Sequence, residues 1–222
     1  MTDVQDFKEK LKILIKNRRS IRKFSNTIVS QELINEIISS GIWAPTGTNQ
    51  QELKFLVVTE EKLRIKFSKF KKIKTAPLII MIFIDFEKYY ESFGDIKYLR
   101  HKRTLPFVDT GMAMMNMILT SEALGLNTVA LNVSDSLWFD NIKNRSIFQK
   151  ILRRIAVKLR LSIFGIEFFQ DFCQQHLEID MKRYIPSGSI AVGYSDKALN
   201  IEKLVYKGKP VKRMSLENYI LK

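Results

Sequence analysis

The feature that most constrains this fold is a helical segment, residues 109–124, whose side chains are apolar on almost every side. A helix without a polar face cannot lie on the surface, so other elements must surround it. We therefore expect it at the centre of the molecule, with Asp109 at its N-terminus, where a carboxylate offsets the helix dipole, and Gly125 at its end. Gly111 would permit close packing, and Asn116 needs a structural hydrogen-bond partner.

Short apolar runs predict the sheet against which this helix packs. Residues 78–84 are apolar without alternation, which is typical of a strand covered on both faces. Ser30 is a suitable N-cap for a helix that ends near Gly41. The remaining expected elements are helices at 4–17 and 60–71 and strands at 55–58, 128–131 and 190–194. Helices interleaved with short strands predict an α+β or α/β fold.

Composition bounds the domain organisation and the compartment. The 222 residues fit a single domain over 1–222, and the lone Cys173 favours a reducing compartment without an intramolecular disulfide. The first residues carry acidic side chains where a secretory signal carries lysine. The longest apolar run is far shorter than the ~18–20 residues that span a bilayer. We expect a cytoplasmic protein.

The charge balance favours anionic partners, because basic residues exceed acidic ones by 37 − 23 = 14. Zinc-finger spacing and aromatic RNA-binding motifs are missing, which disfavours nucleic acid. A glycine-rich dinucleotide motif and a Walker loop are missing too. The stretch at 17–24 is more specific, because its three guanidiniums and one hydroxyl can bind a single phosphate. These groups belong to Arg18, Arg19, Arg22 and Ser20. A solvated basic surface is the alternative interpretation.

Five stretches, in order, make the chain resemble the FMN-dependent nitroreductase family. They are R-R-S-I-R-K-F at 18–24, A-P-T-G-T-N-Q-Q at 44–51, D-T-G-M-A-M-M-N-M-I-L-T-S-E-A-L-G-L at 109–126, A-V-G-Y at 191–194 and K-R-M-S-L-E-N-Y-I at 212–220. The resemblance implies an α+β, nitroreductase-like fold with a central, mostly antiparallel sheet, and an intertwined homodimer with FMN at its interface. It also implies ping-pong transfer of hydride from NADH or NADPH through FMN to a small organic acceptor, such as a nitroaromatic compound or a quinone.

The same resemblance assigns cofactor-binding residues by position. The FMN phosphate and ribityl chain would be held by Arg18, Arg19, Ser20 and Arg22, with Lys212 and Arg213 completing the phosphate site. The loop near the flavin ring, usually supplied by the other subunit, corresponds to Pro45, Thr46, Gly47, Asn49 and Gln51. The backbone near the flavin N5 edge corresponds to Leu131 and Asn132.

Some positions depart from the family pattern. Glu52-Leu53 stands where relatives often have Pro-Trp, and the loop after residue 131 lacks the glycine that many relatives place there, so we expect a divergent branch. Catalysis on FMN requires no side-chain nucleophile or dedicated acid. His101 and His176 lack partners at ligand spacing, so no metal site is predicted. The acceptor and the choice between NADH and NADPH stay open.

Two segments outside these motifs are expected to shape the site. Residues 86–107 form a lid-like excursion, in which Tyr89, Tyr90, Phe93 and Tyr98 would wall the pocket. Residues of about 138–185 form a helical insertion that contains a basic amphipathic helix at 147–163. That helix either caps the dimer or docks on an anionic membrane surface. The alternatives to a cytosolic reductase are thus a membrane-surface-associated flavoprotein and a biosynthetic flavin oxidase or dehydrogenase.

Overall fold

The centre of the fold is a four-stranded antiparallel sheet of order β1-β2-β6-β3. A computed structural model describes residues 2–71, 73, 75–91, 104–131, 137–139, 155, 159, 166–195, 205–206 and 209–210. The sheet strands are β1 (Leu53–Val58), β2 (Leu78–Asp85), β3 (Asn127–Leu131) and β6 (Tyr184–Gly193). Its antiparallel pairing confirms the predicted α+β class.

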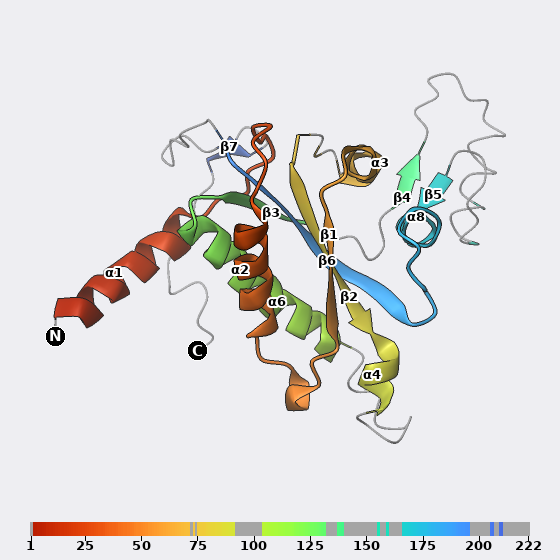
Figure 1. Cartoon of the computed structure of the whole chain (residues 1–222), viewed down its shortest axis with the longest axis horizontal. Coiled ribbons are helices and arrows are strands. Elements are labelled where there is room, and N and C mark those ends of the chain that lie inside the picture. Colours follow the sequence, from red (N-terminus) through yellow and green to blue (C-terminus); the bar gives the residue numbers. More distant parts are fainter. Residues whose placement is uncertain are drawn as a thin grey trace.

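Strand β2 is buried along its whole length, because helices cover both faces of the sheet (Figure 1). Its odd residues, such as Met81, pack in a cluster with Phe67 of α3 (Glu61–Lys71) and Phe169 of α8 (Phe169–His176). Its even residues, such as Ile80, pack with α2 (Gln31–Ile42) and α6 (Leu105–Ala123). This alternation confirms the prediction of a strand covered on both sides.

The helices facing the even residues of β2 begin and end largely as expected. Ser30 caps α2, accepting a hydrogen bond from the Leu33 N–H at 3.4 Å. Gly125, with φ of +76°, ends α6, and the Leu126 N–H donates to the Ser121 carbonyl at 2.8 Å. The start of α6 was predicted wrongly, because the helix begins at Leu105 with a proline in its first turn.

Contacts of α6 test two further expectations. Asn116 donates from Nδ2 to the Ser40 carbonyl of α2 at 3.1 Å, which confirms the predicted structural partner. Gly41 lies so close to α6 that an added Cβ would stand 2.8 Å from the Met117 sulfur. Around Gly111, no described atom lies within 4 Å of such a Cβ. Within the described part of one chain, therefore, nothing packs closely against Gly111.

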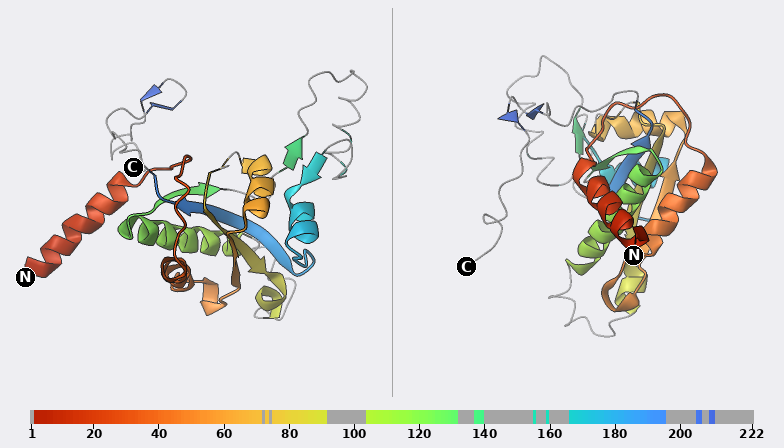
Figure 2. Two further views of the ribbon diagram at one scale, coloured as in Figure 1. Left: turned by 45° about the horizontal axis from the view of Figure 1, so that its top comes forward. Right: turned by 90° about the vertical axis from the view of Figure 1, so that its left-hand side faces the viewer.

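The N-terminal helix α1 (Thr2–Asn17) projects from the body of the molecule (Figures 1 and 2). Its apolar residues Val4, Phe7, Leu11 and Ile15 are exposed. After α1 the chain runs beside β3, to which it is paired by a parallel bridge between Ser20 and Thr128. Among the described residues, no helix is both long and apolar enough to cross a membrane.

The predicted lid and insertion are described only in part. Of residues 86–107, α4 (Phe86–Glu91) is a short helix, Leu105 begins α6, and 92–103 lie outside the described residues. Tyr89 is buried and packs edge-on against Phe86, so it is a core residue and not a pocket wall. The described parts of 138–185 include α8, the start of β6, and a two-stranded antiparallel sheet of β4 (Leu137–Phe139) and β5 (Ile166–Phe168). Residues 155, 159 and 177–183 are also described. A short antiparallel pair is formed by β7 (Val205–Tyr206) and β8 (Lys209–Pro210).

Candidate functional site

The basic segment after α1 is attached to the sheet by two buried side chains and a backbone hydrogen bond. Ile21 and Phe24 are buried in the core, and the Ile21 N–H donates to the Thr128 carbonyl at 2.9 Å. Ser20 and Arg22 point the other way and are exposed. The fold thus holds the backbone of this segment while it presents a hydroxyl and a guanidinium to solvent.

The three arginines of this segment have different surroundings. Arg19 is half-buried and donates from Nη1 to the carbonyls of Lys16 and Arg18, so it fastens the end of α1. Arg18 acts on the carboxyl group of Glu122: burial raises the pKa of Glu122, and the positive charge of Arg18 partly offsets this increase. Arg22 is exposed, and its Nη1 lies 3.5 Å from the Ser20 carbonyl, the outer limit of a hydrogen bond. Arg22 is therefore the arginine best placed to bind an anion.

The loop at 44–51 contains an unusual backbone conformation. Thr48, Asn49 and Gln51 have φ values of 54°, 58° and 53°, in the left-handed region that residues other than glycine seldom adopt. The Asn49 N–H donates to the Thr46 carbonyl, and the Gln51 N–H to the Thr46 hydroxyl, both at 3.0 Å. The Gln51 amide donates to Asn49 Oδ1 at 3.1 Å. Such strain, held by a network of bonds, is typical of functional loops.

The helix α6 anchors this loop from one side. Asp109 lies inside α6 and is buried, which corrects its predicted place at the helix N-terminus. Its Oδ2 accepts a hydrogen bond of 3.0 Å from the backbone N–H of Gly47. Gly47 also packs against the side chain of Leu105, where a Cβ would collide. Pro45 is exposed beside this contact.

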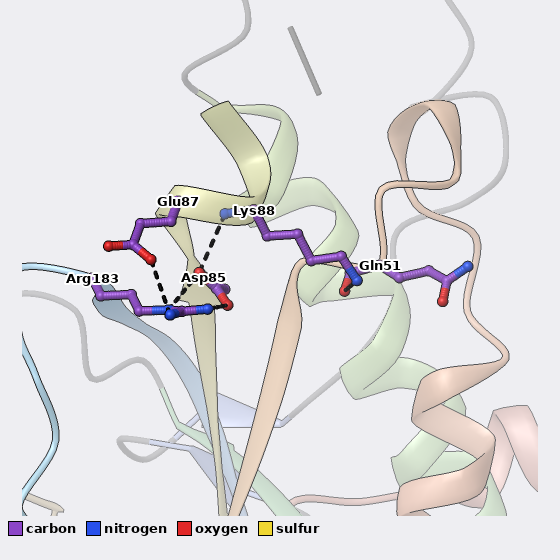
Figure 3. Close-up of polar contacts among 5 residues, drawn as sticks. All are labelled: Gln51, Asp85, Glu87, Lys88 and Arg183. Atoms are coloured by element: carbon purple, nitrogen blue, oxygen red, sulfur yellow. Dashed lines mark hydrogen bonds and ion pairs between the residues drawn. The ribbon is translucent and has the colours of Figure 1, made fainter. Parts of the chain in front are cut away.

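A polar network anchors the same loop from the other side (Figure 3). Lys88 of α4 donates from Nζ to the Gln51 carbonyl at 3.0 Å, and its backbone N–H donates to Asp85 Oδ1 at 3.3 Å. Arg183 binds Asp85 through Nε at 3.1 Å and Nη2 at 2.8 Å, and it pairs with Glu87 at 2.9 Å. The loop is therefore held by a network that includes the last residue of β2 and the residue just before β6.

Glu52, directly after the loop, is fully buried next to Asp109. Burial is the main reason that the pKa of Glu52 is raised to about 7, and the hydrogen bond and charge of Asp109 raise it further. The backbone N–H of Glu52 and, more weakly, the positive charge of Lys88 act in the opposite direction. Within the described part of the chain, neither carboxylate oxygen of Glu52 nor Asp109 Oδ1 has a conventional hydrogen-bond donor.

The basic segment and the loop lie at opposite ends of the sheet (Figure 1). Ser20 forms a bridge with Thr128 of β3. Thr128 pairs with Val192 of β6, and Val192 pairs with Leu78, so the basic segment lies at the Leu78 end of β2. The loop reaches the other end, where the Asp85 N–H donates to the Glu52 carbonyl at 2.8 Å. An eight-residue strand is about 24 Å long. One chain therefore does not bring these two halves of the predicted site together.

The other predicted site residues are placed only in part. Leu131 ends β3 near the middle of the sheet, opposite Ser189, and is buried. Asn132, Lys212 and Arg213 lie outside the described residues. Sequence reasoning missed the roles of Lys88 and of the Asp85–Arg183 pair. A usable signal was Asp85 itself, a carboxylate at the end of an apolar strand, because a buried charge requires a partner.

Comparison with known proteins finds relatives of this chain. The model described as the nitroreductase family matches residues 15–72 and 62–194. The FMN reductase [NAD(P)H] of Bacillus subtilis (strain 168) is 26% identical over 126 residues, which cover 52% of this chain and 51% of that protein. The chain therefore spans about half the length of this curated relative.

Solved structures show the same fold. An FMN-dependent nitroreductase from Clostridium difficile R20291 has a TM-score of 0.59 at 22% identity, covering 87% of this chain and 97% of that one. A protein of Desulfovibrio desulfuricans, solved in complex with FMN, has a TM-score of 0.58 at 23% identity and covers 94% of each chain.

Proposed function

Because the chain belongs to the nitroreductase family, we propose that it is an FMN-dependent oxidoreductase that uses NADH or NADPH. Its relatives include an FMN reductase and an FMN-dependent nitroreductase, which supports this cofactor and this donor. We propose a small organic acceptor, a nitroaromatic compound or a quinone, reduced by a ping-pong mechanism. The cytoplasm stays the predicted compartment, and a buried, unpaired Cys173 is consistent with it.

The observation that carries the proposal is the separation of two candidate half-sites, the basic segment at 18–22 and the loop at 44–51. Arg22 and Asn49 stand at opposite ends of one sheet, too far apart for a single FMN to reach both within one chain. A symmetric homodimer can solve this problem, because each subunit then offers its basic segment to the loop of its partner. We therefore propose two shared sites per dimer.

The exposed apolar surfaces support such a dimer. On α6, Phe107, Val108 and Met115 are 41%, 54% and 46% exposed, and the open Gly111 lies on the same stripe of the helix. Trp43, at the end of α2, is 84% exposed. A helix this apolar is unusual on the surface of a monomer, and a second copy of the chain would cover it.

The residues present fit FMN in their chemistry. Arg22 and the Ser20 hydroxyl are exposed donors suited to a phosphate, and we propose that Lys212 and Arg213 complete its site. The amides of Asn49 and Gln51 offer donors and acceptors to ring atoms, and the backbone at Leu131 and Asn132 would lie along the ring edge. When bound, FMN supplies the hydride chemistry between NAD(P)H and the acceptor. The chain binds and orients both substrates in one pocket.

The absorption spectrum of the purified protein tests the cofactor and the donor together. We expect the bands of oxidised FMN, bleached under anaerobic conditions by NADH or by NADPH and restored by a quinone or a nitroaromatic compound. Parallel lines in double-reciprocal plots would support the ping-pong mechanism. A colourless protein that stays free of flavin after incubation with FMN would contradict the proposal.

Site variants test the residues. Arg22→Ala and Arg213→Ala should each lose FMN, because each removes a charged donor from the proposed phosphate site. Lys62→Ala is the matched control, since it removes an exposed positive charge from α3, outside the proposed phosphate site. Retention of FMN at wild-type affinity in both arginine variants would refute the assignment.

One observation keeps membrane docking as a second candidate. In the predicted amphipathic helix, the Leu159 N–H donates to the Ile155 carbonyl at 2.9 Å, as in a helical turn, and these side chains are 62% and 49% exposed. A basic helix with exposed apolar residues fits an anionic lipid surface. Flotation with anionic liposomes at low and moderate salt tests this, because charge-dependent attachment weakens with salt.

A further inference from the structure

The buried neighbours Glu52 and Asp109 present an electrostatic problem. Both side chains are 0% exposed, and Asp109 raises the pKa of Glu52 both as a hydrogen-bond partner and through its charge. Three of their four oxygens have no conventional donor in the described part of the chain, and the fourth accepts from Gly47. Two ionised carboxylates repel strongly where water is excluded, whereas one proton between them turns repulsion into a hydrogen bond.

We infer that Glu52 keeps a proton, which it shares with Asp109 in a hydrogen bond, and that this pair positions the loop at residues 46–51 for FMN. The inference rests on the proposed function insofar as FMN binds at this loop. Glu52 and Asp109 are positioning residues, because they act through the loop backbone. Loss of the shared proton should release the loop and weaken FMN binding.

The geometry explains why the loop responds to the pair. Asp109 fixes one side of the loop through the Gly47 N–H at 3.0 Å, and Glu52 is bonded covalently to Gln51 at the other side. Asp109 is held within the 19-residue helix α6, and the strained loop is the softer element. When Glu52 loses its proton, we expect the loop to move.

The surrounding charges set the direction of the effect. From α4, Lys88 donates to the Gln51 carbonyl, and its charge favours ionised Glu52. From the end of β2, the Asp85 N–H binds the Glu52 carbonyl, but the Asp85 carboxylate is neutralised by Arg183. Burial and Asp109 outweigh the Glu52 backbone N–H and Lys88, since the pKa of Glu52 is raised to about 7. The pair should therefore hold its proton in mildly acidic solution and lose it in mildly basic solution.

The variant Glu52→Gln tests the coupling to FMN. Glutamine keeps the size of glutamate, and its amide donates to Asp109 at every pH. FMN is titrated against the full-length protein by fluorescence quenching at about pH 5.5 and about pH 8.5. Between these two pH values, we expect the Kd for FMN to rise roughly tenfold more in the wild type than in Glu52→Gln. The reason is that loss of one linked proton changes affinity by up to tenfold per pH unit.

The comparison between variants removes the ionisation of the FMN phosphate, which affects both equally. Glu60→Gln, at an exposed position, is the matched control and should keep the wild-type pH profile. An identical pH profile in wild type and Glu52→Gln would overturn the positioning role.

A second measurement uses only the wild-type protein, so it depends neither on FMN nor on the folding of a variant. Infrared spectra of the flavin-free wild-type protein should show the C=O stretch of a buried carboxylic acid at about pH 5.5 and lose it by about pH 8.5. Isotopic labelling of glutamate and aspartate assigns the band. If the protein binds no FMN at either pH, the proposed function fails, while the infrared band still decides whether the proton is shared. A missing band overturns the shared proton whatever the FMN result.

Discussion

Arg183 binds the buried carboxylate of Asp85 through two parallel hydrogen bonds, from Nε at 3.1 Å and from Nη2 at 2.8 Å. This pair joins the start of β6 to the end of β2, next to the loop that carries Asn49 and Gln51. Burial alone would raise the pKa of Asp85, but the hydrogen bonds and positive charge of Arg183 outweigh it and leave this pKa below its usual range. The pair therefore stabilises the fold at neutral pH.

Arg183→Met should lower the Tm by about 3–6 °C at neutral pH, because it leaves Asp85 buried without its partner. Since the pKa of Asp85 is lowered in the folded state, this loss should shrink as pH falls below the ordinary aspartate value of 3.8 and Asp85 is protonated. Thermal unfolding monitored by circular dichroism measures it. The exposed neighbour variant Lys182→Met should keep the wild-type Tm. Equal effects of both variants would show that the ion pair contributes nothing.

Glu52→Gln should stabilise the flavin-free protein at about pH 8.5 by about 1–3 kcal/mol and have little effect near pH 4. The folded pKa of about 7 lies above the ordinary glutamate value of 4.5, so the proton bound by the folded state favours folding at low pH. That contribution is lost as pH rises from about 4.5 to about 7. Urea unfolding across this range measures the difference. A constant difference between the two proteins at every pH would contradict the raised pKa.

Mixing two defective chains should restore FMN binding. Arg22→Ala and Asn49→Ala each damage a different half of the proposed shared site, so a heterodimer has one site with both lesions and one with neither. Random mixing by co-expression should recover about a quarter of the wild-type FMN sites, because half of the dimers are mixed and each carries one intact site. Flavin content per chain provides the measurement. Recovery of no FMN would mean that both residues serve the same site in one subunit.

Met115→Glu should convert the proposed dimer into a monomer and release its FMN at the same time. The substitution places a charge in the exposed apolar stripe of α6, where burial against a second copy would require its desolvation. Ile65→Glu is the control, because Ile65 is 52% exposed on α3, on the opposite face of the sheet. Sedimentation velocity with absorbance of flavin reports both properties. A dimeric Met115→Glu protein with its FMN retained would place the interface elsewhere.

Gly125→Ala should destabilise the protein by about 1 kcal/mol through its backbone alone. Its φ of +76° disfavours any residue with a Cβ, although no described atom lies within 4 Å of the position that a Cβ would take. Chemical denaturation gives the value. Gly125→Asn is the informative companion, since asparagine tolerates the left-handed region better and should recover part of the loss.

The local elements were readable from the sequence because their signals are local. The unbroken apolar run of β2, the Ser30 cap and the glycine after α6 each report on neighbouring residues. The start of α6 was missed because Leu105 and Pro106 looked like part of an irregular excursion, although proline is well tolerated in a first helical turn. That error also placed Asp109 at a helix end and hid its contact with Gly47.

The sequence by itself determined which segments pack and which residue types can hold a phosphate and a flavin ring, since apolar periodicity and donor chemistry are properties of short stretches. Only the tertiary structure decided that Arg22 and Asn49 stand at opposite ends of one sheet, and that Glu52 loses its water beside Asp109. Strand register and burial depend on residues far apart in the chain. The distance between two half-sites and the proton affinity of a carboxyl therefore follow from the folded arrangement.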